Sequence, residues 1–121
     1  MYKLYAIVSM EAVKKTNGVR GKMTAQTGHA FLHAFWDAEQ RFVADARGYR
    51  NSEHATKITL CVDTDQQLQE LCAAYNAVCG TSLVTDAGFT VFSESTITCL
   101  GIGPIHSDKV GQDLKDLKLF C

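Results

Sequence analysis

The longest periodic segment of the sequence, from Lys22 to about Ala46, has the residue spacing of an α-helix. At about 100° per residue its apolar residues fall on one stripe, which holds Gly28, Phe31, Phe35, Ala38 and Phe42, with Leu32 at its edge. The opposite side is polar and partly aromatic, and it carries Lys22, Gln26, His29, His33, Trp36 and Gln40. A helix with one apolar face buries that face against another element. We therefore expect a helix with an apolar back and a polar front.

Shorter segments with strand or helix patterns surround this helix. Apolar runs predict four strands, at residues 2–10, 56–62, 82–85 and 96–102. Turn residues at 16–18 and a break at 47–52 flank the long helix. Thr64 and Gln67 have capping-box spacing for a second helix, which ends near Val78 because Gly80 stops it. Ser107 can cap a last helix.

The order of these segments predicts the fold class. Strands and helices alternate along most of the chain, which indicates an α/β fold with helices covering a mainly four-stranded sheet. Right-handed crossovers would place the helices on both faces of that sheet. No internal repeat, low-complexity tract or linker interrupts the 121 residues. We therefore expect residues 1–121 to form a single domain.

Composition excludes several classes of protein. No stretch approaches the roughly 20 apolar residues of a membrane-spanning helix, so we expect no membrane partner. The five cysteines are odd in number and include no C-x-x-C pair, whereas disulfide scaffolds and zinc ribbons have even counts at short spacings. We therefore expect small buried cysteines in a reducing, cytoplasmic compartment, and no metal site.

The net charge of −1 conceals two halves of opposite sign. Residues 1–62 have a balance of +4 and residues 63–121 a balance of −5. The densest basic stretch contains Lys14, Lys15, Arg20 and Lys22 with only one acidic residue. Such an asymmetry predicts a local anion-binding surface, although a solvated loop would have the same composition.

Two motifs bring together residues that can do chemistry. The segment from Gly21 to Gln26 begins the long helix, where backbone N–H groups and the Lys22 ammonium suit an anion or an oxyanion. The segment from Asp86 to Thr90 follows a strand, and ligands of open α/β sheets usually bind at the carboxyl ends of strands. Asp86 could instead only organise a turn. Whether Asp86 meets Lys22 in space separates these two interpretations.

Taken together, the motifs resemble the type 2 peptidyl-tRNA hydrolase family. The resemblance follows the same order over nearly the whole chain: GKMTAQTGHA at residues 21–30, VDT at 62–64, TDAG at 85–88, GIGP at 101–104 and LKLF at 117–120. It implies a three-layer α/β/α domain with a mixed sheet, which hydrolyses the ester that links a peptide to tRNA. It also implies that no metal or organic cofactor is needed. Relatives often pair, so the resemblance further implies a homodimer.

The resemblance also assigns roles to single residues. The functional lysine, glutamine, aspartate and threonine of the family align with Lys22, Gln26, Asp86 and Thr90. Lys22 could stabilise an oxyanion or bind phosphate, and Asp86 could orient or deprotonate water held by the Thr90 hydroxyl. Gln26, one helical turn from Lys22, could hold the ester or the terminal ribose.

Five further residues are candidate substrate contacts: Lys14, Lys15, Arg20, His29 and Trp36. His29 could be a base or a structural residue. Trp36 could stack on a base or pack at the rim of the domain.

Two departures from the family pattern keep a second hypothesis open. Typical relatives have an Arg and an Asp-Leu where this chain has residues 9–13, and they have an Arg where it has Phe89. These substitutions favour a non-catalytic RNA- or protein-binding module that kept the fold. A hydrolase of another ester or amide is a third interpretation, because a fold alone does not fix its chemistry.

Overall fold

The computed structural model describes residues 1–88, 92 and 94–121 of the chain. Within these residues five strands form one open sheet of order β3-β4-β1-β2-β5. The strands are β1 (Tyr2–Ser9), β2 (Lys57–Val62), β3 (Thr81–Asp86), β4 (Thr96–His106) and β5 (Lys118–Leu119). The sheet is mixed, because β1 and β2 are parallel while the β1–β4, β3–β4 and β2–β5 pairs are antiparallel. The predicted four-stranded sheet therefore needs correction to five strands.

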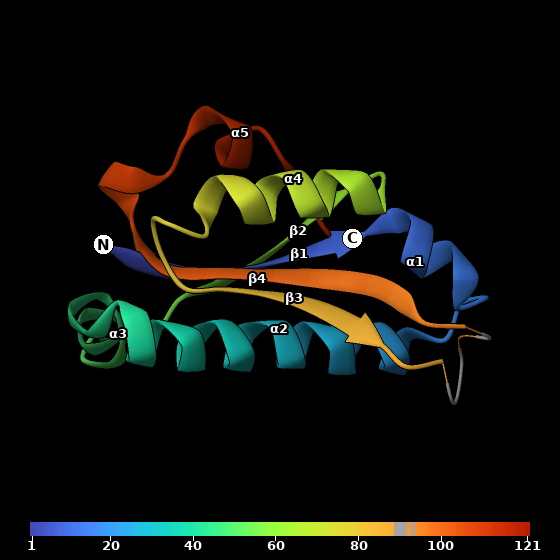
Figure 1. Ribbon diagram of the computed structural model, residues 1–121, viewed down its shortest axis with the longest axis horizontal. Helices are drawn as coiled ribbons and strands as arrows, with labels where there is room; N and C mark the ends of the chain where they lie inside the picture. The colour runs from blue at the N-terminus through green and yellow to red at the C-terminus, as the bar shows by residue number, and fades with distance from the viewer. Residues whose placement is uncertain (89–91, 93) are drawn as a thin grey trace.

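Helices cover both faces of the sheet (Figure 1). Figure 1 shows α2 and α3 below the sheet and α4 and α5 above it, with α1 at the right-hand end. Their bounds are α1 (Met10–Lys15), α2 (Arg20–Arg41), α3 (Val43–Arg50), α4 (Asp65–Tyr75) and α5 (Gln112–Lys115). Separate apolar clusters fill the two sides. One cluster joins α4 and α5 to the sheet through Leu68 and Leu114, and a second joins α2 to it through Met23 and Ala30. A third joins α2 and α3 to β1 through Ala34, Tyr49 and Leu4.

The strand directions bring three chain segments to one edge of the sheet. Because β3 and β1 are both antiparallel to β4, β3 runs in the same direction as β1 and β2. The carboxyl ends of these strands, at Ser9, Val62 and Asp86, therefore point to the same end of the molecule. The N-terminus of α2 lies at that end too (Figure 1). This is the edge at which α/β proteins bind ligands.

The buried side of α2 differs from the predicted one. Three of its five buried residues are alanines, and the full set is Met23, Gln26, Ala30, Ala34 and Ala38. Only Ala38 belongs to the predicted stripe, and Phe31 and Phe35 lie half-buried at the flanks. The reason is the close approach of α2 to β4, where a Cβ on Gly101 would collide with the Ala30 carbonyl oxygen. Alanines fit this narrow gap and phenylalanine rings do not.

Several predicted boundaries are also shifted. The long helical pattern is two helices separated at Phe42, and α3 continues through the predicted break to Arg50. The capping box of Thr64 and Gln67 is confirmed at the start of α4. The predicted last helix is instead a 3₁₀ turn at Ser107–Lys109, the single turn of α5, and β5. The final residues extend because β5 pairs with β2, and the Phe120 N–H donates to the Thr59 carbonyl.

The expected burial of the cysteines is confirmed for two of them, whereas Cys61 and Cys72 are half-buried and Cys121 is exposed. All five are free thiols, and Cys79 and Cys99 are buried. Burial raises the pKa of each of these two thiols to about 12. They are therefore protonated and pack as small apolar side chains. Among the described residues, no helix is both long enough and apolar enough to span a membrane.

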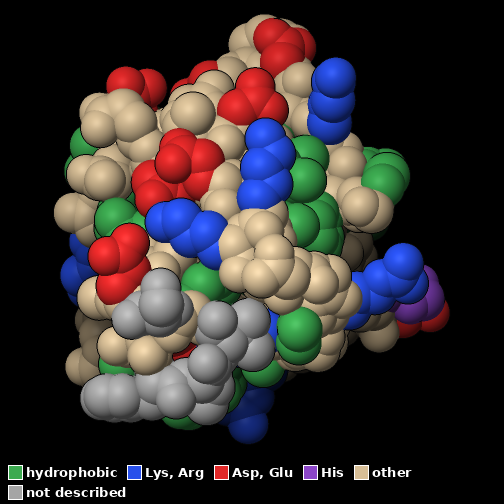
Figure 2. Space-filling view, turned by 90° about the vertical axis from the view of Figure 1, so that its right-hand side faces the viewer, with side chains coloured by type: hydrophobic (Ala, Val, Ile, Leu, Met, Phe, Trp, Pro, Cys, Tyr) green, Lys and Arg blue, Asp and Glu red, His purple; other side chains and the backbone are tan. Residues whose placement is uncertain are grey.

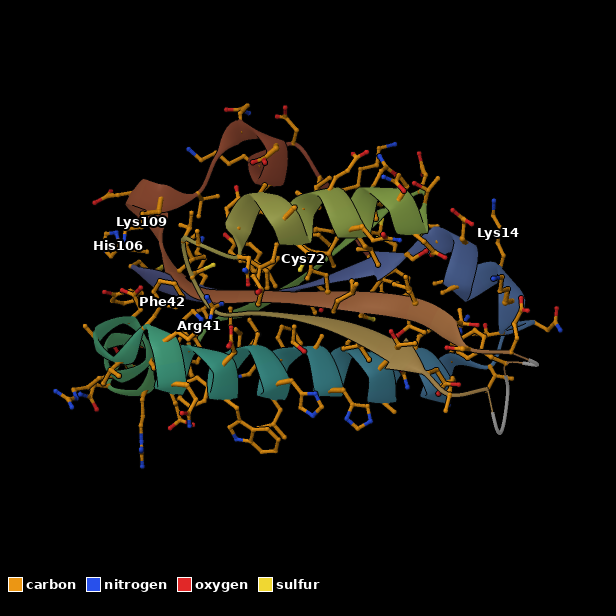
Figure 3. All side chains as sticks on the ribbon, viewed as in Figure 1. Lys14, Arg41, Phe42, Cys72, His106 and Lys109 are labelled. Carbon is orange, nitrogen blue, oxygen red and sulfur yellow. The ribbon has the colours of Figure 1, made fainter. Side chains whose placement is uncertain are left out.

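At its far end α2 is fastened to two other elements by Arg41 (Figure 3). The guanidinium donates to both carboxylate oxygens of Asp37, at 2.9 and 2.6 Å, and to the Asn76 carbonyl beyond α4, at 2.8 Å. Asp37 also accepts from the Thr81 N–H at the start of β3, at 3.0 Å. Arg41 lowers the pKa of Asp37, so this carboxylate is charged at neutral pH.

The contact between α2 and β4 predicts a difference between two glycine substitutions. Gly101→Ala should lower the free energy of unfolding by about 1–3 kcal/mol, because the added methyl collides with the Ala30 backbone. Gly28→Ala is the control on the same helix. A Cβ there meets nothing within 4 Å, so this change should raise stability by roughly 0.5–1 kcal/mol. Urea denaturation followed by circular dichroism measures both, and equal stabilities would contradict the proposed packing.

Candidate functional site

Lys22 and Asp86 meet at the carboxyl edge of the sheet. The Lys22 Nζ lies 2.6 Å from the Asp86 Oδ1, and the two side chains are 16% and 11% exposed. Lys22 is in the first turn of α2, and Asp86 is the last residue of β3. Residues that are 64 positions apart in the sequence thus form one ion pair. This contact is the observation that the sequence analysis needed to favour a ligand site over a simple turn.

Asp86 also organises the turn that follows it. Its Oδ2 accepts from the Gly88 N–H at 2.9 Å. Gly88 has a φ of +87°, and a Cβ there would collide with the Glu94 backbone, so the turn needs glycine. The two interpretations of Asp86 are therefore compatible: one oxygen shapes the turn while the other binds Lys22.

The charge state of Asp86 follows from these contacts. The hydrogen bond from Lys22 lowers the pKa of the carboxyl most, with smaller help from Gly88 and from the lysine charge. Burial raises the pKa of this carboxyl, but by less than these contacts lower it. Asp86 is therefore a carboxylate at neutral pH, which is the form that can accept a proton.

Gln26 lies one turn beyond Lys22, on the sheet side of α2. It is 5% exposed, and its Oε1 accepts from the Thr98 hydroxyl at 2.8 Å. The same hydroxyl is 3.3 Å from the Val84 carbonyl. Gln26 was predicted on the polar front of the helix, which is wrong, because Thr98 on β4 provides a buried partner for its oxygen. The isolated polar position of Thr98 in an apolar strand was the signal that sequence reasoning missed.

A cavity of about 470 Å³ lies between α2 and the edge strand β3. Its walls combine both elements, with Gln26, His29 and His33 from α2 and Leu83, Val84, Thr85, Asp86 and Ala87 from β3 and the residue after it. Asp86 thus borders an open space in which a water and a substrate group can approach its carboxylate. The Phe92 ring, 2% exposed, lies 5.8 Å from the Lys22 Nζ and adds a cation–π contact.

Comparison with known proteins identifies the family to which this fold and site belong. The family model for peptidyl-tRNA hydrolase PTH2 matches residues 2–120. This chain belongs to that family. A peptidyl-tRNA hydrolase of Methanococcus maripaludis is 37% identical over 84% of this chain and 87% of its own length. Proteins of the same name from Methanothermobacter thermautotrophicus and Methanopyrus kandleri are 38% and 35% identical over the same share of this chain, and over 88% and 86% of their own lengths.

The basic candidates of this PTH2 family member lie at the same end of the molecule. Lys14 and Lys15 are exposed on α1, and Arg20 is exposed at the start of α2. Figure 2 shows Lys and Arg side chains gathered in the middle of this face, with Asp and Glu side chains beside them. Lys14 points away from the body of the molecule in Figure 3. Lys14, Lys15 and Arg20 form a basic rim rather than a part of the Lys22–Asp86 contact.

The structure describes some of the remaining candidate residues and not others. His29 and Trp36 are both exposed on α2, and His29 borders the cavity. Thr90 and Phe89 lie outside the described residues, so their roles stay predictions. No cluster of three or more His, Cys, Asp or Glu side chains that could hold a metal occurs in the part of the chain that the structure describes.

Residues 9–13, where the resemblance implies a departure from the family pattern, take part in a local hydrogen-bond network. The buried Ser9 hydroxyl donates to the Asp65 Oδ1 at 2.6 Å and accepts from the Ala12 N–H, which caps α1. The Glu11 carboxylate accepts from the Asp65 N–H at 3.0 Å. These bonds join the end of β1 to the start of α4. Residues 9–13 therefore build scaffold at the start of α4.

The Lys22–Asp86 pair should stabilise the fold in a pH-dependent way. Because the folded pKa of Asp86 is below its ordinary value of 3.8, the unfolded chain binds this proton first as the pH falls. The contribution is therefore full above about pH 4 and is lost as the pH falls through the folded pKa. Asp86→Asn should cost more unfolding free energy at pH 7 than at about pH 3. Asp63→Asn, at an exposed residue, is the control. A cost for Asp86→Asn that does not change with pH would contradict the assignment.

Proposed function

We propose that this chain hydrolyses the ester bond between the peptide and the tRNA in peptidyl-tRNA and releases free tRNA. The observation that carries the proposal is the ion pair of Lys22 and Asp86 beside an open cavity at the carboxyl edge of the sheet. Membership of the peptidyl-tRNA hydrolase PTH2 family supports it, as do the names of the relatives.

Asp86 and Lys22 have complementary roles in the proposed reaction. The Asp86 carboxylate takes a proton from a water in the cavity while the water oxygen attacks the ester carbonyl carbon. The carbonyl oxygen then gains negative charge, which the Lys22 ammonium stabilises. When the intermediate collapses, the bond to the terminal ribose oxygen breaks. That oxygen takes the proton back from Asp86 and leaves as a hydroxyl group of tRNA.

Gln26 and Thr90 position the reactants in this proposal. Because the Gln26 Oε1 accepts from Thr98, the orientation of its side-chain amide is fixed. Its NH₂ group would donate to the ester or to the terminal ribose. The Thr90 hydroxyl would hold the attacking water. A cytoplasmic location and a homodimer are part of the same proposal.

Two substitutions test the proposed reaction. Lys22→Ala and Asp86→Ala should each lower kcat/KM for an N-blocked aminoacyl-tRNA by roughly 10²–10³-fold, because each removes a charge that the transition state needs. Release of free tRNA by purified protein measures the rate, and circular dichroism checks folding. Lys115→Ala and Asp108→Ala, on exposed residues, are the matched controls.

Three results would overturn the proposal or part of it. Full activity in both site variants would show that the assigned residues are wrong. If the parent protein binds tRNA but releases none, the chain is the non-catalytic binding module. If it hydrolyses only other esters or amides, the substrate class is wrong.

The basic rim predicts how salt affects the reaction. Phosphate contacts release counterions, so kcat/KM at low substrate should fall steeply as salt is added. Removing Lys14 and Lys15 together should flatten the slope of log kcat/KM against log salt by roughly 0.7–0.9 for each phosphate that these lysines neutralise. The matched double variant Lys109→Ala/Lys115→Ala should leave the slope unchanged, because Lys109 lies at the opposite end of the molecule from Lys14 (Figure 3). Equal slopes in the two double variants would show that the basic rim does not contact the phosphates of tRNA.

A further inference from the structure

The exposed side of α2 carries three aromatic rings in contact. The ring centroids of His29 and His33 are 5.6 Å apart, and those of His33 and Trp36 are 5.3 Å apart. The planes of the last two rings are only 18° apart, so they stack. Trp36 is the only tryptophan of the chain, and this large ring is 52% exposed. We call these three side chains the ring stack.

The ring stack is continuous with the site of the proposed reaction. His29 and His33 line the cavity that Asp86 also lines. From there the stack leads along α2 to Trp36, over seven residues or about 10 Å at 1.5 Å per residue. That length matches about three nucleotides at the ~3.4 Å spacing of a stacked strand.

The chemistry of the proposed substrate determines what can lie on this surface. The ester is on the terminal ribose of tRNA, so the nucleotides next to the reacting atoms are the unpaired ones at the 3′ end. They must leave the cavity along its walls. Unpaired bases expose flat π faces, and proteins bind them by stacking on aromatic side chains. A flat, exposed ring pair suits such bases better than it suits a peptide of varied sequence.

We propose that the ring stack binds the unpaired 3′ nucleotides of tRNA, with a base stacked on the open face of Trp36. This inference rests on the proposed function, because it places the terminal ribose in the Asp86 cavity. Stacking has little dependence on base identity. The ring stack therefore provides affinity for the 3′ end of any tRNA, and the basic rim contacts phosphates elsewhere.

A binding experiment tests the inference without hydrolysis. Trp36 is the only tryptophan, so its fluorescence reports on this surface alone. Titration with the trinucleotide cytidine–cytidine–adenosine should quench the emission in a saturable way, and inorganic phosphate should not. His33→Ala should weaken trinucleotide binding, whereas Val43→Ala, at a residue as exposed as Trp36, should not. No quenching by the trinucleotide, or equal quenching by phosphate, would overturn the inference.

A kinetic experiment adds the link to the reaction. Trp36→Ala should raise KM for an N-blocked aminoacyl-tRNA by about tenfold, as expected when one base can no longer stack, with little change in kcat. Trp36→Phe should restore most of the affinity because it keeps a ring. The KM for an N-acetyl-aminoacyl ethyl ester, which has no nucleotide, should not change. An equal increase in KM for both substrates would overturn the inference.

Two results distinguish this inference from the proposed reaction and from a dimer interface at the same surface. If the parent hydrolyses no ester while the trinucleotide still quenches Trp36, the proposed reaction fails and RNA binding by the ring stack stands. If Trp36→Ala converts a dimer to a monomer in sedimentation, a second copy of the chain covers this surface and the inference is overturned.

Discussion

The close contact between α2 and β4 determines where the functional side chains lie. Gly101 leaves room for the Ala30 backbone, and Ala34 and Ala38 continue the same narrow interface. With these residues turned toward the sheet, Gln26 is carried inward to Thr98, and Lys22, one turn earlier, comes within reach of Asp86. The site is thus a consequence of a packing requirement several residues away. The small side chains on one face of α2 set the orientation of the helix, and this orientation places Lys22 beside Asp86 at the end of β3.

The ion pair itself is suited to chemistry because it is only partly buried. A fully buried pair would be costly to desolvate and closed to substrate, and a fully exposed one would be weakened by water and salt. Lys22 and Asp86 are 16% and 11% exposed, and Asp86 borders an open cavity, so the charges persist and the carboxylate remains reachable. The family match covers residues 2–120, and residues 9–13 lie in the scaffold that joins β1 to α4.

The sequence was sufficient for features that depend on local or strongly patterned signals. The α/β class and the capping box of Thr64 and Gln67 were accessible to it. Lys22 and Asp86 were accessible as candidates, but whether they meet was decided only by the structure. The predictions from sequence were wrong where contacts between elements, rather than average hydrophobicity, decide which side chains are buried. Periodicity assigned the large Phe31 and Phe35 to the core, but the space over Gly101 admits only alanines. Likewise, Gln26 looked like a surface residue until Thr98 supplied a buried partner. β5 was missed because its two residues extend only through pairing with β2.

The edge strand β3 is tied to α2 at both of its ends. Its first residue, Thr81, donates to Asp37, which Arg41 holds in place, and its last residue, Asp86, pairs with Lys22. β3 is an edge strand and pairs with β4 on one side only, so these two contacts add to that pairing in holding it against the helix. These contacts fix the separation of β3 and α2. The space between the two elements cannot widen unless a contact to a charged side chain breaks. The width of this cavity is therefore set by the scaffold before any substrate arrives.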